Sequence, residues 1–170
     1  MDRRPTLLSS CARAATAAEA RFRINAPAFT ARSSRVIALD GQAAEVLRDL
    51  AERTWHGGHF LLFESEVPGD ALLRLVAAGD GGDRAATALL SEELDGADTV
   101  VMVASAAGSP AAASLIGDAT AARGIMTVGL VLPGTAPVDA AMVALRPNAM
   151  VLVLPGNVAD IPEILSALRV

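Results

Sequence analysis

Residues 80–131 read DGGDRAATALLSEELDGADTVVMVASAAGSPAAASLIGDATAARGIMTVGLV, and this stretch decides the fold. Its hydrophobic pattern predicts, in order, a helix over 84–94, a buried strand over 99–104, a turn of small residues, a helix over 111–123 and a buried strand over 125–132. Pro110 suits the start of the second helix and Gly124 suits its end. A strand, a helix and a strand in succession form a βαβ unit, so we expect a parallel sheet.

The rest of the chain continues the alternation of strands and helices. Apolar runs predict further strands over 35–39, 59–63 and 150–154. Apolar spacing predicts further helices over 42–54, 138–145 and 161–168. Between the second strand and residue 84 the sequence indicates a Pro68-Gly69 turn, a short amphipathic segment over 70–78 and a loop over 80–83. We therefore expect an α/β fold: a three-layer αβα sandwich around a mostly parallel, Rossmann-like sheet of about five strands.

Charge divides the chain into a basic head and an acidic body. Residues 1–35 contain seven Arg and two acids, a net charge of +5, whereas residues 36–170 contain seven Arg and 17 acids, a net charge of −10. The sequence thus predicts a basic N-terminal arm over 1–34 and a Rossmann-like domain over 35–170. The head has the Arg-rich, acid-poor composition of an organellar transit peptide, but the absence of Lys is typical of a GC-rich bacterial genome and favours an arm.

The composition argues against several classes of function. An acidic body does not favour nucleic-acid binding, which depends on neutralising phosphates. The sequence contains no apolar run of 18 residues, so we expect no membrane span. The single cysteine, Cys11, cannot form an internal disulfide, and with His only at His56 and His59 the chain lacks a metal-ligand set. These features favour the cytoplasm.

The strongest candidate site is the small-residue loop after the strand over 99–104. Ser105, Gly108, Ser109 and Ser114 surround the predicted start of a helix, where hydroxyls and free backbone N–H groups can converge on a phosphate or carboxylate. The simpler alternative is that Ser109 only caps the helix. The sequence predicts an anionic small molecule as the ligand and leaves both interpretations open.

Other polar residues are weaker candidates. Asp40 and Gly41 end the first strand, where Asp40 could contact a ribose hydroxyl or a cation, although Asp is also common at strand ends. Glu64 and Glu66 follow the second strand, but no GxGxxG precedes the first helix, so an NAD site is not expected. His56 and His59 are expected at the opposite, amino edge of the sheet as solvated turn residues, and no catalytic constellation is evident.

The order of these motifs resembles the nucleotide-binding half of the bacterial tubulin-like family FtsZ. The matching residues are GAD at 96–98, before a buried strand, and TVGLV at 127–131, after the small-residue loop and helix. The resemblance extends more weakly to VIALDG at 36–41 and VLVLPGN at 151–157. It implies a nucleotide as the bound cofactor or ligand.

The departures from that family imply binding without hydrolysis. The family's phosphate loop is close to GGGTGTG, whereas residues 105–111 read SAAGSPA with one glycine, and the parts of the family that complete hydrolysis have no counterpart here. We expect a non-hydrolysing module that binds a nucleotide or another anionic ligand and can form a homo-oligomer. SAAGSPAAAS also resembles, more briefly, the serine-rich loop of sugar-isomerase (SIS) domains, which implies a phosphosugar enzyme or sensor. A third interpretation is an interaction subunit that docks a protein partner through its arm.

Overall fold

The computed structural model describes residues 32–76 and 86–170 of the chain, within a compact unit over Ala31–Val170. Its elements in chain order are β1 (Ser34–Ala38), α3 (Gly41–Ala51), β2 (Gly58–Val67), β3 (Asp70–Leu75), β4 (Thr87–Leu89), α4 (Leu90–Glu93), β5 (Thr99–Ala104), α5 (Pro110–Ala121), β6 (Met126–Val131), α6 (Asp139–Leu145), β7 (Val151–Val153), the 3-10 turn η2 (Val158–Asp160) and α7 (Ile161–Ala167). The predicted arm up to residue 31 and the predicted loop over 80–83 lie outside the described residues.

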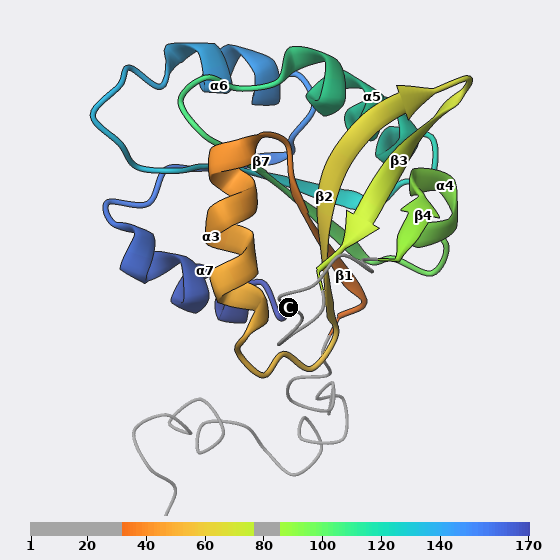
Figure 1. Cartoon of the computed structure of the whole chain (residues 1–170), viewed down its shortest axis with the longest axis horizontal. Helices are drawn as coiled ribbons and strands as arrows, with labels where there is room; N and C mark the ends of the chain where they lie inside the picture. The colour runs from red at the N-terminus through yellow and green to blue at the C-terminus, as the bar shows by residue number, and fades with distance from the viewer. Residues whose placement is uncertain (1–31, 77–85) are drawn as a thin grey trace, which may run out of the picture. The chain divides into compact units, whose positions relative to one another are not determined.

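One sheet with the strand order β4-β3-β2-β1-β5-β6-β7 runs through the described part of the chain (Figure 1). The five strands β2, β1, β5, β6 and β7 pair in parallel, and β3 and β4 extend the sheet beyond β2 in antiparallel fashion. Numbering the parallel strands alone gives the order 2-1-3-4-5, a common doubly wound arrangement. The chain leaves β1 toward one side and β5 toward the other, so the winding reverses between these two strands.

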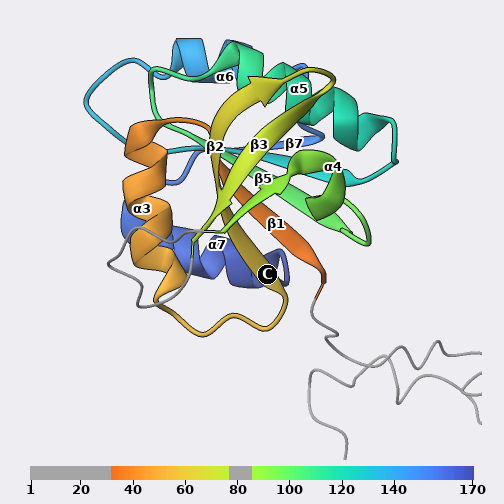
Figure 2. The same ribbon diagram turned by 45° about the vertical axis from the view of Figure 1, so that its right-hand side comes forward.

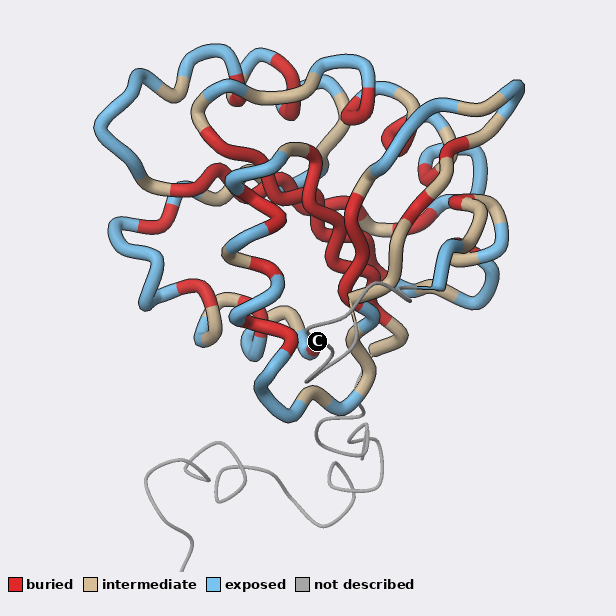
Figure 3. Tube along the Cα trace, in the orientation of Figure 1, coloured by how far each residue is buried: buried red, intermediate tan, exposed pale blue. Residues whose placement is uncertain are grey.

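Helices cover both faces of the sheet, which confirms the three-layer α/β fold. Figures 1 and 2 show α3 and α7 on one face and α5 and α6 on the other. Alternate residues of each central strand supply the two cores: Val36 and Ala38 pack with α3 and α7, whereas Ile37 packs with α4, α5 and α6. The buried residues concentrate along the central strands (Figure 3). Burial on both faces explains why these strands are almost continuously apolar.

The region between β2 and β5 differs from the sequence-based prediction. Residues 70–75 form the strand β3, whose Ala71 and Leu73 are fully buried at a two-residue period, and not a separate amphipathic segment. Pro68 and Gly69 form the tight turn into it, with a positive φ at Gly69 that favours glycine. The helix predicted over 84–94 is wrong for most of its described length, because residues 87–89 pair with β3 and only Leu90–Glu93 is helical.

These two antiparallel strands raise the sheet to seven strands from the expected five. The parallel strands account for the five that the βαβ pattern predicted. The N-terminal boundary also lies slightly earlier than residue 35, since β1 begins at Ser34. Ser33 and Asp98 are already bonded: the Ser33 N–H donates to Asp98 Oδ2 at 3.0 Å and the Asp98 N–H donates to the Ser33 carbonyl at 2.8 Å. Residues 32–34 therefore belong to the folded unit.

Candidate functional site

The winding reversal between β1 and β5 brings Asp40 against the loop that follows β5. Asp40 is the N-cap of α3, and its Oδ1 accepts the Ala43 N–H at 3.0 Å. Its Oδ2 accepts the Ser105 N–H at 2.8 Å. One carboxylate thus joins the start of α3 to the end of β5. Open α/β sheets bind ligands at this position, outside the carboxyl ends of the strands where the winding reverses.

The start of α5 lies in the same loop and keeps backbone donors available. Ser109 is its N-cap residue, but the Ser109 side chain makes no capping hydrogen bond. Pro110 has no N–H, and the N–H groups of Ala111 and Ala112 have no acceptor among the described residues. The first turn of this 12-residue helix therefore presents two free donors at its positive end. The alternative prediction, that Ser109 only caps the helix, is not borne out because the capping bond is absent.

Gly108 fixes the path of the loop that leads to α5. Its φ is +64°, a conformation that side chains disfavour, and a Cβ there would lie 3.0 Å from the Ala141 Cα. The Gly108 N–H donates to the Ser105 carbonyl at 3.0 Å, which closes the turn. The loop therefore packs directly against the backbone of α6, and glycine is needed for close packing rather than for approach to a ligand.

The structure brings together most of the predicted site residues but not all of them. Asp40 and Ser105 are bonded, Gly41 opens α3 beside them, and Gly108 and Ser109 complete the loop. Ser105 is buried, and its N–H is already used by Asp40. Ser114 lies more than one turn into α5 on its exposed side, so it is not part of the first turn. The sequence signal for the Asp40 contact was its position before a helical run, which is typical of an N-cap.

The charge at this carboxyl edge favours small, weakly charged anions. The segments that follow β1, β5 and β6, residues 39–42, 105–111 and 132–138, contain no Arg and one acid, Asp40, and Asp139 opens α6. Backbone donors are therefore the source of attraction for an anion here. A polyphosphate would lack the cations that normally neutralise it.

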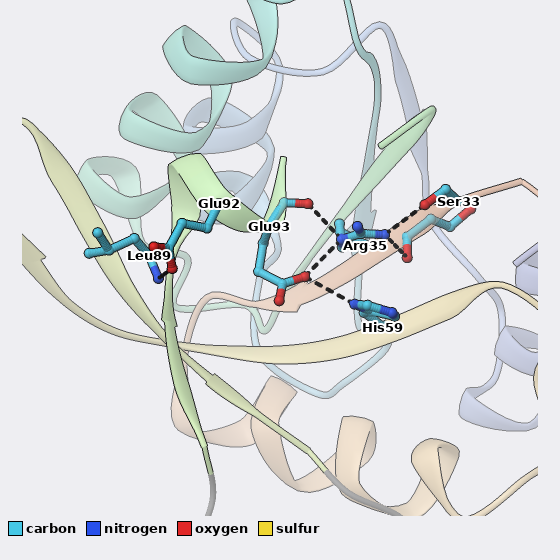
Figure 4. A network of polar contacts seen from close by, with 7 residues as sticks. Ser33, Arg35, His59, Leu89, Glu92 and Glu93 are labelled. Atoms are coloured by element: carbon cyan, nitrogen blue, oxygen red, sulfur yellow. Dashed lines mark hydrogen bonds and ion pairs between the residues drawn. The ribbon is translucent and has the colours of Figure 1, made fainter. Parts of the chain in front are cut away.

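The opposite, amino edge carries a buried ion-pair network that the sequence analysis missed (Figure 4). Arg35 Nε lies 2.8 Å from Glu93 Oε2 and 2.7 Å from the Glu93 carbonyl oxygen, and Arg35 Nη1 donates to Ser33 Oγ at 3.0 Å. His59 Nδ1 lies 3.0 Å from the same Glu93 oxygen. The Arg35 and Glu93 side chains are 7% and 12% exposed, whereas that of His59 is 53% exposed. The predicted amino-edge position of His59 is confirmed, but the residue is more than a solvated turn residue.

Three hollows among the described residues lie away from the carboxyl edge of β1 and β5. Two adjoin at the amino edge, share Trp55, Gly58 and His59, and measure about 490 and 260 Å³. The third, about 470 Å³, lies between the β2–β3 turn, α4 and α5, and is lined by Asp70 and Arg123 among others. Burial acts to raise the pKa of Asp70, but hydrogen bonds from Ser91 and Ala71 and the charge of Arg123 hold that pKa below its ordinary value of 3.8.

Within residues 32–76 and 86–170, no group of three or more His, Cys, Asp or Glu side chains is placed to hold a metal ion. No helix in this described part of the chain is both long and apolar enough to cross a bilayer.

This chain shows a distant structural similarity to a solved protease structure. No protein-family model matches the chain, and no curated protein matches it. Among solved structures, the chain is similar to a secreted C11 cysteine protease from Bacteroides thetaiotaomicron, "iotapain", with 11% sequence identity and a TM-score of 0.43. The similarity covers 75% of this chain and 53% of the protease, so the chain spans about half the length of that structure. A likeness at this TM-score carries no functional conclusion.

Proposed function

We propose that this domain is a non-hydrolysing module that binds a small anionic molecule, such as a nucleotide, at the carboxyl edge between β1 and β5. The observation that carries the proposal is the start of α5, where Ala111 and Ala112 keep free N–H groups and Ser109 leaves its capping position unused. An anion at this point would accept those donors and meet the positive end of the helix.

The surrounding residues narrow the class of ligand. Because the three segments at this edge contain no Arg, we propose an anion with a single charged group, such as a nucleoside monophosphate or a carboxylate, in preference to a triphosphate. Asp40 retains acceptor capacity beyond its two backbone bonds, so it would suit a hydroxyl of the ligand, as in the ribose role expected from the sequence. The resemblance to FtsZ supports the nucleotide part of this proposal and nothing more specific.

We propose that the module binds its ligand without catalysing a reaction and that it works in the cytoplasm. The only two histidines of the chain, His56 and His59, belong to the turn before β2 and to the start of β2, at the other edge of the sheet. The Ser109 hydroxyl makes no hydrogen bond to a described side chain that could act as its general base. A sugar phosphate is the second ligand class to test, because the same helix start would receive its phosphate.

The test is a thermal-shift screen of the full chain against nucleoside mono- and triphosphates, sugar phosphates and small carboxylates. A ligand at about 100 times its dissociation constant should stabilise the protein by roughly 2.7 kcal/mol. We expect a monophosphate or carboxylate to shift the melting temperature more than a triphosphate. The absence of a shift with every anion would overturn the proposal and favour an interaction subunit.

Two serine variants on the same helix then locate the site. Ser109→Asp places a negative charge at the free donors and should abolish the shift, whereas Ser114→Asp adds the same charge beyond the first turn and should retain most of it. Each variant is compared with its own ligand-free melting temperature, so that a change in stability is not mistaken for a loss of binding. An unchanged shift in Ser109→Asp would contradict this location.

A further inference from the structure

The two adjoining hollows at the amino edge surround the indole ring of Trp55. Trp55, Gly58 and His59 line both hollows, and we call the two together the Trp55 recess. The larger hollow, of about 490 Å³, has the size of a small-molecule site, and the smaller one extends it by about 260 Å³. The recess is thus large enough for a ligand with more than one chemical part.

The Trp55 ring is held in a fixed orientation. Its Nε1 donates to the Leu50 carbonyl at 2.8 Å, near the end of α3, and its ring centroid lies 5.5 Å from that of Phe60. Trp55 is half-buried, so part of the ring stays accessible from the recess. An aromatic surface that is already ordered loses little conformational entropy when the ring of a ligand packs on it.

The two hollows differ in polarity. Apart from Arg53 and the shared residues, the smaller hollow is lined by apolar side chains from α3, β2, β3 and the residue after β3: Ala51, Phe60, Leu75 and Val76. The larger hollow is lined by polar side chains around the ring: Arg32, Ser33, His56 and His59. A ligand that filled both hollows would therefore need an apolar part and a polar part.

The positive charge of the recess is not balanced by acids. Among the described residues, no Asp or Glu lines either hollow, and the Arg32 and Arg53 side chains form no ion pair. Arg32 Nη1 lies 3.4 Å from the Met126 sulfur, which is uncharged. The domain as a whole is acidic, with 17 acids against seven Arg over residues 36–170. Arginines without carboxylate partners in such a domain favour a negatively charged ligand at this place.

The two histidines add hydrogen-bonding groups beside Arg32. His59 Nδ1 lies 3.0 Å from Glu93 Oε2, so the His59 Nε2 points away from that carboxylate (Figure 4). His56 is exposed and makes no hydrogen bond with a described residue. Guanidinium and imidazole N–H groups on one side of a hollow match the oxygens of a phosphate or a carboxylate.

We propose that the Trp55 recess binds a small molecule that joins a flat aromatic ring to an anionic group. The ring would pack on Trp55 toward the smaller hollow, and the anionic group would accept N–H groups of Arg32 and the histidines in the larger one. Aromatic carboxylates and nucleoside monophosphates share this chemistry. The recess lies at the opposite edge of the sheet from the start of α5, so it is separate from the carboxyl-edge site and does not depend on it.

Trp55 itself reports on binding, because it is the only Trp of a chain without Tyr. The fluorescence of the full chain is titrated with benzoate and with adenosine monophosphate, and then with adenosine and inorganic phosphate, each of which supplies one part alone. We expect a saturable change with at least one of the two aromatic anions, and dissociation constants about tenfold or more weaker for adenosine and phosphate. A response to benzoate alone assigns the ligand to the aromatic carboxylates, and a response to adenosine monophosphate alone assigns it to the nucleotides.

Two arginine variants form a matched pair for locating the site. Arg32→Gln removes a positive charge from the recess and should weaken binding by about tenfold or more in dissociation constant. Arg48→Gln removes the same charge from an exposed position on α3 that does not line the recess, and should leave binding unchanged. Circular dichroism confirms that each variant is folded.

Three results would overturn the proposal. The first is the absence of a saturable response to both aromatic anions. The second is adenosine or phosphate binding as tightly as the aromatic anions, because the recess would then not require a ring and a charge in one molecule. The third is an equal effect of Arg32→Gln and Arg48→Gln, which would show that any binding takes place outside the recess.

Discussion

The two edges of the parallel sheet are built from different kinds of interaction. At the amino edge, Arg35 and Glu93 bury full charges against each other, and His59 joins them from the surface. At the carboxyl edge, Asp40 bonds only backbone N–H groups, and the start of α5 leaves further donors without acceptors. These charged groups of the amino edge are thus paired with one another, whereas the carboxyl edge still has hydrogen-bonding capacity for a ligand. The difference separates a network of paired charges from a region whose free donors support the proposed binding site.

The largest expected effect is at the amino edge. Arg35→Ala leaves the nearly buried Glu93 carboxylate without its partner and should lower the free energy of unfolding by about 3 kcal/mol. Equilibrium urea unfolding measures this loss. His59→Ala removes only the exposed partner and should cost less than about 1 kcal/mol. Equal losses in the two variants would show that the network does not depend on the buried pair.

Substitution of Asp40 tests the contribution of the carboxyl edge to stability in the same way. Asp40→Ala removes the N-cap of α3 and the acceptor of the Ser105 N–H together, and should cost about 2 kcal/mol. Asp40→Asn keeps one acceptor oxygen and should lose about half as much. If the asparagine variant were as unstable as the alanine variant, Asp40 would stabilise the fold mainly through its negative charge and not through its hydrogen bonds.

Two glycines at the carboxyl edge form a matched pair. Gly108→Ala places a Cβ 3.0 Å from the Ala141 Cα at a positive φ, and should destabilise the fold by about 1–2 kcal/mol. Gly41→Ala, in the first turn of α3, meets nothing within 4 Å and should change stability by less than about 0.5 kcal/mol. Thermal unfolding of both variants checks this contrast, which tests whether the β5–α5 loop is rigidly packed on α6.

Asp70 has the smallest expected effect and links the β2–β3 turn to the amino-edge network. Its Oδ1 accepts the Ser91 N–H at 3.2 Å in α4, the helix that carries Glu93. Because the pKa of Asp70 is lowered in the folded state, its stabilising contribution is present above pH 3.8 and is lost as the pH falls through the lower folded-state pKa. The stability difference between the wild type and Asp70→Asn should therefore shrink below pH 3.8 in acid-unfolding curves. A difference that is constant over that range would show that Asp70 ionisation does not contribute.

The parallel part of the fold could be predicted from the sequence because its signals are local. The strand β5 and the helix α5 each show their own periodicity, and Pro110 and Gly124 mark the ends of the helix region. The segments over 70–78 and 84–94 could not be assigned in the same way. The pairing of residues 87–89 with β3 depends on tertiary contacts, which override a helical pattern as short as this one.

The candidate site was predictable in position but not in detail. The strand ends indicated the loop after β5, and Asp40 was placed near it. That the Asp40 carboxylate takes the Ser105 N–H, and that Ser109 leaves α5 uncapped, depends on how β1 and β5 lie side by side. The Arg35–Glu93 pair was missed for a similar reason, because its partners are 58 residues apart and no local pattern joins them.

The bond between Asp40 and Ser105 also bears on the order of folding. It joins residues 65 positions apart and forms only when the parallel pairing of β1 with β5 is in place. Parallel pairing over such separations closes a long loop before it gains contacts, so it is expected to be a slow step. The site between these strands is then completed together with the native sheet. A ligand bound there would bind the native fold and not its partly folded precursors. It would therefore lower the population of partly folded molecules, which are the ones open to aggregation and proteolysis.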